Sequence, residues 1–362
     1  MAILAMSRRA ILALHGLCRT SHGQDARATR GPAGLTMESY PYKFVPIYKE
    51  KIWGGRNLQR LFGRLLPAGK AIGESWELAD LVEGVSRVAN GPAAGTTLTD
   101  LTSQLGPRLL GCCRPTPDGR FPLLLKLLDA NDKLSLQVHP DADAVQAIGG
   151  DAAAKTECWY VIESRDGMIY KGVLPGATAE QFRGAIENNT VEQFVKAWRV
   201  AAGDFHYLPA GTVHALGAGV VVAEVQTPSD ITYRVTDWGR GREIHVERSM
   251  QCIHFTQASG FTEADTVAPG AQGDTLLDTE FFTVTRREAA AGKPAALPAG
   301  RCAAVMMLSA KTPAEIRHAG AAEPATEVSA GDTVLVPACL EHPEIVTDSA
   351  CAWLEVTLPD NR

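Results

Sequence analysis

AGDFHYLPAGTVH at residues 202–214 is matched 128 residues later by AGDTVLVPACLEH at residues 330–342, and the two segments align without a gap. Each segment predicts a strand, a turn that contains proline and a second strand. The alignment places His214 opposite His342. An internal repeat of this kind indicates two related β-units in one chain. The stretch at about 258–275, rich in Ala, Gly, Thr and Asp, is the predicted connection between them.

Short apolar runs broken by Gly and Pro extend outward from the repeat and predict a mainly β fold. The clearest predicted strands lie at 121–130, 159–164 and 167–174. Two helices are predicted to interrupt the strands, at 178–189 and 190–200, because each begins with Thr and carries Gln three residues later, as a capping box does. We therefore expect two β-barrels with a small helical insertion at about 176–200.

The barrels are expected at residues 37–257 and 275–362, which leaves the first 36 residues apart. Those 36 residues carry five arginines and a single acid, Asp25. This composition predicts a disordered segment or a wrongly assigned extension, with translation starting at Met37. A targeting peptide is the alternative, although its apolar part is short and is interrupted by His15.

Composition and charge narrow the class of function. The net charge of −6 and the lack of a Lys/Arg cluster argue against nucleic acid as the main partner. No apolar run reaches the roughly 18 residues that predict a membrane span. The eight cysteines form no CxxC pair, which favours reduced thiols and a cytoplasmic location. We expect a small-molecule partner and a monomer or weak homo-oligomer.

Four residues form a candidate metal site. Gln137 and His139 are spaced i, i+2 in SLQVHP, so on a strand both side chains leave the same face. Glu157 in KTECW and His214 in GTVHAL lie in similarly apolar, strand-like settings. Two nitrogen and two oxygen donors suit a divalent first-row metal, zinc first, with a position left for water or substrate.

These strings together resemble a known family. GDFHYLPAGTVH is similar to a signature of the cupin β-barrels. Taken with QVHP, KTECW, GTVHALG and EVQTPSDITYRVTDWGR (224–240), it resembles the type I mannose-6-phosphate isomerases, specifically their short bacterial form. KEKIWGG (49–55) and GESWELAD (73–80) fit the same family, and the resemblance covers about residues 40–250 strongly.

The resemblance implies two cupin (jelly-roll) barrels and an isomerase that interconverts mannose 6-phosphate and fructose 6-phosphate through a cis-enediolate. It implies one zinc ion per chain, held by Gln137, His139, Glu157 and His214. The C-terminal barrel is expected to lack a metal, because nothing near His342 repeats the QVH pair or the glutamate of KTE.

Two further residues are expected to act in the reaction. Glu224, an acid within the apolar string VVVAEVQ, is the first candidate for the base that moves a proton between C1 and C2. A role in orienting a metal ligand is the alternative, with His206 or a metal-bound water then acting as the base. Arg234 matches the family's functional arginine and would stabilise enediolate charge or bind phosphate, unless it only pairs with Asp237.

Substrate-binding residues are expected at Lys155, Lys126 and Ser135. Lys155 and Ser135 each lie two residues from a metal-ligand candidate, and Lys126 interrupts an apolar strand. Two rival functions stay open from the sequence. One is a cupin oxygenase with Fe(II) in the same shell, and the other is a sugar-binding or regulatory cupin without turnover.

Overall fold

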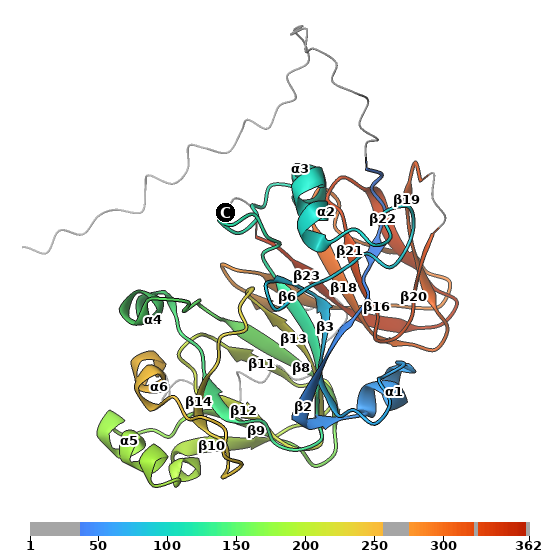
Figure 1. The fold of residues 1–362 in the computed structure, drawn as a ribbon. Coiled ribbons are helices and arrows are strands. Elements are labelled where there is room, and N and C mark those ends of the chain that lie inside the picture. Colours follow the sequence, from blue (N-terminus) through green and yellow to red (C-terminus); the bar gives the residue numbers. More distant parts are fainter. Residues whose placement is uncertain (1–36, 256–274, 322–324, 360–362) are drawn as a thin grey trace, which may run out of the picture. The chain divides into compact units, whose positions relative to one another are not determined.

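Two facing antiparallel sheets form the N-terminal half of the protein (Figure 1). The computed structural model describes residues 37–255, 275–321 and 325–359. The first sheet has the strand order β11-β8-β13-β6-β2-β3, with bounds Phe205–Leu208, Glu157–Ser164, Val220–Gln226, Leu124–Ala130, Ile47–Gly55 and Ile72–Leu78. The second has the order β10-β9-β12-β7-β14, with bounds Val195–Arg199, Met168–Val173, His214–Leu216, Leu136–Val138 and Tyr233–Thr236.

The C-terminal half is built in the same way from two more sheets. One has the order β1-β21-β18-β23-β16-β15, with bounds Tyr42–Lys43, Thr333–Val336, Ala303–Ala310, Cys351–Thr357, Thr283–Ala289 and Thr275–Asp278. The other has the order β17-β22-β19-β20, with bounds Ala295–Ala296, Glu341–Val346, Ala314–Ala319 and Thr326–Val328. A small hairpin of β4 (Asp80–Leu81) and β5 (Gly84–Val85) completes the described strands.

The mainly β fold in two similar halves is therefore confirmed. The repeated segments form corresponding strands, because β11 and β21 are separated by the predicted offset and β12 and β22 follow them. In the described residues each half consists of two separate sheets rather than one closed barrel. His342 is exposed and has a left-handed backbone with φ of 48°, whereas His214 is buried. The two histidines therefore align in sequence but have different structural environments.

The predicted domain boundaries stay a prediction, because most of the predicted connection lies in residues 256–274, outside the described residues. The predicted extension at 1–36 lies outside them as well. The strand β1 at the start of the described chain pairs with β21, Tyr42 opposite Leu335. The start of the described chain thus contributes a strand to a sheet of the C-terminal half.

Alternation along β13 explains how the sheets pack. Val221, Ala223 and Val225 enter a core shared with strands β16, β18 and β23 of the C-terminal half. Val220 and Val222 point to the opposite face, into the interior of the N-terminal half. Because both faces are buried, the strand is almost continuously apolar. Glu224 has the same parity as Val220 and Val222, which directs a carboxylate into that interior.

One predicted helix is confirmed and the other is wrong. The helix α5 spans Ala179–Glu187, and Thr178 and Gln181 form the predicted capping box. The segment after Thr190 forms only a 3-10 turn at Val191–Phe194 and then the strand β10, which pairs with β9. Thr190 makes no capping hydrogen bond, and pairing with β9 provides the backbone partners that a helix would have supplied.

The remaining helices are short and lie outside the predicted insertion. They are α1 (Asn57–Phe62), α2 (Leu98–Leu105), α3 (Pro107–Leu110), α4 (Ala142–Ile148) and α6 (Val246–Cys252). Among the residues described, none of the helices has both the length and the apolar character needed to cross a membrane.

Candidate active site

A cavity of about 290 Å³ lies between the two sheets of the N-terminal half. Residues from β2, β3, β6 and β13 of one sheet and from β7 and β14 of the other reach it. Its lining consists of Lys51, Trp53, Glu74, Lys126, Leu128, Leu134, Ser135, Gln137, Lys155, Glu224, Asp230, Thr232, Arg234 and Arg242. This lining includes six of the predicted site residues: Lys126, Ser135, Gln137, Lys155, Glu224 and Arg234.

The three strongest metal-ligand candidates meet beside this cavity. His214 Nε2 lies 3.0 Å from Glu157 Oε1, and His139 Nε2 lies 3.5 Å from Glu157 Oε2. All three side chains are buried, with at most 1% of each residue exposed. Glu157 begins β8 in one sheet, whereas His214 begins β12 in the other and His139 follows β7. The facing of the two sheets therefore creates the cluster.

The turn of the GTVH string brings His214 to His139. Gly211 has a φ of 84°, and an added Cβ would lie only 2.5 Å from the ring of His254. The Gly211 amide also donates a hydrogen bond of 2.9 Å to the carbonyl oxygen of His139. Because only glycine accepts this conformation and this close approach, the turn fixes the distance between the two histidines.

Backbone carbonyls orient both imidazole rings. His139 Nδ1 lies 2.8 Å from the carbonyl oxygen of Ile231, and His214 Nδ1 lies 2.9 Å from that of Thr212. A carbonyl can only accept, so each Nδ1 carries the proton and each Nε2 keeps its lone pair. Both lone pairs belong to the atoms that approach Glu157.

The protonation states also suit metal ligands. Burial and the ammonium of Lys155 lower the pKa of His139 to about 3, so the imidazole is neutral at physiological pH. Burial alone would raise the pKa of Glu157, but the ammonium of Lys155 outweighs it and holds the pKa well below its usual value. A neutral imidazole and an ionised carboxylate are the forms that bind metal ions.

A divalent metal ion fits this cluster. The ligand atoms of His139, Glu157 and His214 all lie within 4.8 Å of one another. Ligands bound at about 2.0–2.2 Å around one ion are about 3–4 Å apart, close to the separations found here. Neither oxygen of Glu157 accepts a well-aligned hydrogen bond from the described residues, although Lys155 Nζ lies 2.8 Å from Oε2. The carboxylate therefore retains lone pairs for an ion.

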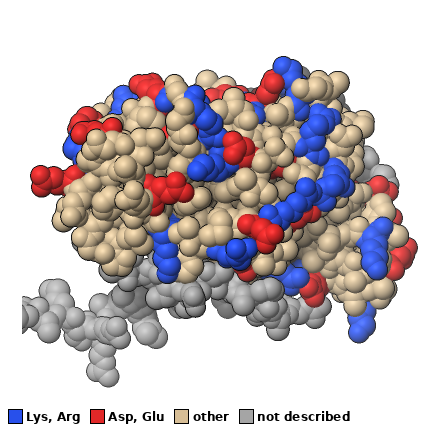
Figure 2. All heavy atoms as spheres, turned by 90° about the horizontal axis from the view of Figure 1, so that it is seen from below, with Lys and Arg blue, Asp and Glu red and all other residues tan. Residues whose placement is uncertain are grey.

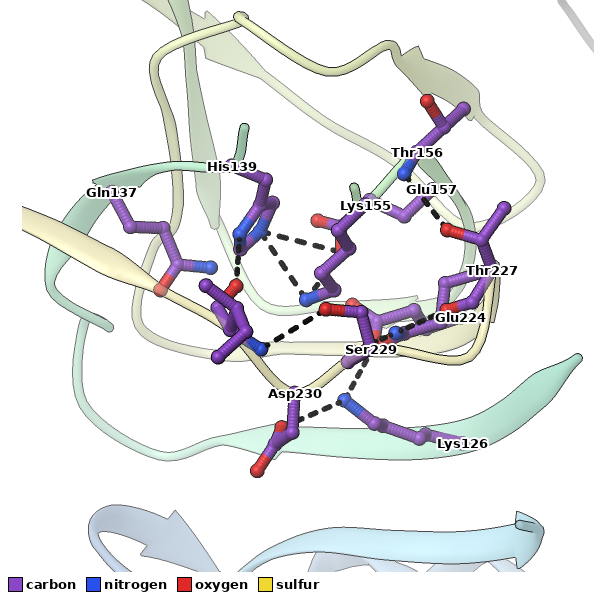
Figure 3. A network of polar contacts seen from close by, with 12 residues as sticks. Lys126, Gln137, His139, Lys155, Thr156, Glu157, Glu224, Thr227, Ser229 and Asp230 are labelled. Atoms are coloured by element: carbon purple, nitrogen blue, oxygen red, sulfur yellow. Dashed lines mark hydrogen bonds and ion pairs between the residues drawn. The ribbon is translucent and has the colours of Figure 1, made fainter. Parts of the chain in front are cut away.

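Gln137 lies next to the cluster but presents its amide nitrogen, which is 3.2 Å from His214 Nε2. Its strand position is opposite His214 on one side and Arg234 on the other. Rotation of the amide group by about 180° would exchange nitrogen for oxygen and add a fourth donor. Figure 3 shows Gln137 and His139 extending from neighbouring positions toward Lys155 and Glu157.

Lys126 and Glu224 form a second buried group in the cavity wall (Figure 3). Lys126 Nζ lies 3.1 Å from Glu224 Oε1, 3.8 Å from Asp230 Oδ1 and 4.0 Å from Glu74 Oε2. Burial alone would lower the pKa of Lys126, but these carboxylates raise it above its usual value. Trp159 Nε1 donates a hydrogen bond of 2.7 Å to Glu224 Oε2. Lys126, which interrupts an apolar strand, is thus buried and paired with carboxylates.

The other predicted residues lie as follows. Lys155 Nζ is 3.2 Å from His139 Nε2, so this lysine contacts two of the ligand candidates. Ser135 is buried and lines the cavity. Arg234 lines it too, and its Nη1 donates to the carbonyl oxygen of Glu243 at 2.7 Å. The alternative pairing of Arg234 with Asp237 is not found, because Asp237 pairs with Arg240 and Arg242.

Comparisons with known proteins agree with this geometry. The family model described as the phosphomannose isomerase type I catalytic domain matches residues 42–167. A probable mannose-6-phosphate isomerase of Bacillus subtilis is 40% identical over 222 residues, which is 59% of this chain and 69% of the relative. The mannose-6-phosphate isomerase of Streptococcus mutans is 38% identical over 242 residues, which is 65% of this chain and 74% of the relative.

The chain belongs to the type I mannose-6-phosphate isomerases. The crystal structure of the Bacillus subtilis mannose 6-phosphate isomerase has the same fold, with a TM-score of 0.73 at 27% identity. That match covers 87% of this chain and 99% of the other chain. The resemblance first seen in the motifs is therefore confirmed.

Several cavity residues of this family member were missed in the sequence. Lys51 and Glu74 come from β2 and β3, and their side chains pair at 2.7 Å. Arg242 comes from the loop after β14. Asp230 also lines the cavity and lies 3.8 Å from Lys126 Nζ. The charged residues within the two strand-like strings KEKIWGG and GESWELAD were the available signal for the first two.

Proposed function

We propose that the chain is a metal-dependent aldose–ketose isomerase that interconverts mannose 6-phosphate and fructose 6-phosphate. The observation that carries the proposal is the buried cluster of His139, Glu157 and His214 beside a cavity lined by basic side chains. Membership in the mannose-6-phosphate isomerase family supports the substrate. A binding protein would not require an acid and a metal site together on the same cavity.

The proposed metal is zinc, one ion per chain, held by Gln137, His139, Glu157 and His214. Nitrogen and carboxylate oxygen donors suit zinc, and the set lacks the thiolates typical of closed structural sites. A bound zinc ion would supply a Lewis acid beside the oxygens on C1 and C2 of the sugar. Of these four residues, Gln137 lines the cavity, so the site would be open to the substrate on that side.

Proton transfer is assigned to Glu224. A base must lie within hydrogen-bond reach of the protons on C1 and C2, and Glu224 is a carboxylate in the cavity wall. The ion pair with Lys126 and the hydrogen bond from Trp159 hold it in one position. Arg234 would stabilise the negative charge that develops on the substrate oxygens as the enediolate forms.

Substrate contacts are assigned to Lys155, Lys126 and Ser135, whose buried polar atoms lie in the cavity wall. A small anionic sugar is the partner that this concave, basic site suits. On the face drawn in Figure 2, basic side chains lie among acidic ones, unlike the continuous basic surface of nucleic-acid-binding proteins. The seven cysteines of the described residues are free thiols, which supports a cytoplasmic location.

A coupled assay for fructose 6-phosphate formed from mannose 6-phosphate tests the proposal. We expect turnover with mannose 6-phosphate and at least about tenfold lower kcat/KM with mannose, because the basic cavity favours the phosphate ester. Calorimetry on the same preparation would measure binding separately from turnover. Tight binding of mannose 6-phosphate without formation of any fructose 6-phosphate would overturn the isomerase and leave a sugar-binding protein.

A further inference from the structure

The basic residues of the cavity divide into two groups. Each of the three lysines is paired with a carboxylate: Lys51 with Glu74 at 2.7 Å, Lys126 with Glu224 at 3.1 Å and Lys155 with Glu157 at 2.8 Å. The two arginines, Arg234 and Arg242, have no such partner among the carboxylates that line the cavity. Within the described residues, Arg234 forms no ion pair, and Arg242 pairs only with Asp237, which lies outside the lining, so a ligand in the cavity would meet these guanidinium groups without a carboxylate beside them in the wall.

These two arginines lie near one another. Burial lowers the pKa of Arg234, and the charge of the neighbouring Arg242 lowers it further. Arg234 is placed by β14, opposite Gln137, and therefore lies beside the metal-ligand candidates. Two guanidinium groups that line the same cavity can both donate to one phosphate group, whose oxygens match the geometry of a guanidinium.

Asp237 sets the position of Arg242. It is buried, with 1% of the residue exposed. Its Oδ1 accepts hydrogen bonds from Arg242 Nε at 3.0 Å and Nη2 at 2.5 Å, and its Oδ2 accepts one from the Arg242 backbone at 3.2 Å. Asp237 thus binds one edge of the guanidinium and does not use Nη1. Arg242 itself remains about one third exposed, in the cavity lining.

The loop that carries these residues, 237–245, is anchored at its base and along its length. At its base, Arg234 and His245 exchange two hydrogen bonds of 2.9 Å. Trp238 Nε1 donates to the carbonyl oxygen of Leu134, and Arg240 Nη1 donates to that of Lys133 at 2.7 Å. The segment at 133–134 leads directly into β7, the strand of Gln137. Arg242 is consequently held at a fixed place relative to the candidate metal site.

We propose that Arg242, beside Arg234, is the residue that recognises the phosphate group of the substrate, and that Asp237 is its positioning residue. The inference rests on the proposed function for the identity of the substrate, but the phosphate site itself is argued from the cavity. The lysines, whose carboxylate partners belong to the site itself, are then left for the sugar hydroxyls. Arg240 binds the other side of Asp237 and anchors the loop without lining the cavity.

Steady-state kinetics of three variants tests the assignment. R242Q should raise KM for mannose 6-phosphate about 10- to 100-fold, because a charge-assisted pair to phosphate is lost, while kcat changes less than about threefold. R242K should recover part of the affinity, since it restores the charge but not the paired donors. D237N should raise KM about 3- to 10-fold. R199Q, which replaces an exposed arginine of β10 that pairs with Asp166 and does not line the cavity, is the matched control and should change KM less than about twofold.

Calorimetric titration with inorganic phosphate supplies a second measurement that needs no turnover. The wild-type protein should bind phosphate, and R242Q should bind it more weakly by the same factor as its rise in KM. If the wild-type protein binds phosphate, R242Q binds it more weakly and neither isomerises the sugar, the proposed function fails but the phosphate site stands. If the wild-type protein isomerises the sugar and R242Q binds phosphate equally well, the phosphate site is overturned and the function stands. A loss in R242Q confined to kcat, or an equal KM rise in R199Q, would also overturn the assignment.

Discussion

The role of Glu224 can be tested by replacing it with glutamine, which keeps the size of the side chain and removes its basicity. Trp159 Nε1, which donates to Glu224 Oε2 at 2.7 Å, can donate equally to the amide oxygen of glutamine. Lys126 loses its nearest carboxylate at 3.1 Å but keeps Asp230 at 3.8 Å and Glu74 at 4.0 Å. The buried ammonium is therefore not left without a counter-charge.

These contacts set the expected magnitudes. Orphaning a buried charge costs about 3–5 kcal/mol, so with two carboxylates remaining we expect E224Q to destabilise the protein by less than about 3 kcal/mol. Loss of a positioned general base lowers kcat about 10²- to 10⁴-fold, or about 2.7–5.4 kcal/mol in the barrier. The catalytic effect should thus exceed the effect on stability.

The assay is kcat at saturating zinc and saturating mannose 6-phosphate, with bound metal measured on the same sample. If Glu224 only orients a metal ligand, E224Q would lose about 10- to 100-fold in metal affinity, and excess zinc would restore its kcat. E74Q, which removes another carboxylate near the same lysine, is the control and should lower kcat less than about tenfold. Wild-type kcat in E224Q, within about threefold, would refute Glu224 as the base.

Two further predictions concern the fold. T178A should lower the free energy of unfolding by about 1 kcal/mol in urea titrations, because Thr178 closes the capping box of α5. T190A is the control and should lower it by less than about 0.5 kcal/mol, because Thr190 forms no cap. Equal losses in the two variants would contradict the capping role of Thr178. Burial alone raises the pKa of Glu74, but Lys126 and Lys51 lower it to about 2, so its contribution to stability is present above its ordinary pKa of 4.5 and is lost as the pH falls from there toward about 2. In the metal-free protein, the stability difference between wild type and E74Q should shrink between pH 5 and pH 3, and a constant difference would argue against the ion pairs.

The sequence predicted most of the features that depend on local pattern. The repeat at 202–214 and 330–342 predicted the two related halves, because strands alternate and turns need Pro and Gly at fixed positions. The sequence also singled out His139, Glu157 and His214, which the structure brings together, because each belongs to a strand-like string of recognisable residues. Which sheet faced which followed only from the structure.

The wrong helix prediction and the missed cavity residues share a physical cause. Contacts between distant parts of the chain decide these features, and local sequence patterns do not reveal such contacts. The segment after Thr190 has a helical pattern, yet β10 forms because its backbone pairs with β9. Lys51 and Glu74 come from strands more than 50 residues before the nearest ligand candidate, so no local spacing connects them with the site. Arg242 reaches the cavity only because the loop at 237–245 folds back over the segment before β7.

Removing and restoring the metal would show whether His139, Glu157 and His214 hold a catalytic ion. Chelator-treated wild-type protein and H214A would be titrated with zinc while bound metal and formation of fructose 6-phosphate are followed in the same sample. We predict that wild-type activity returns in proportion to zinc and saturates at about one ion per chain, and that H214A recovers neither tight binding nor turnover. Full activity in metal-free wild-type protein, or zinc-dependent turnover in H214A equal to wild type, would contradict the account.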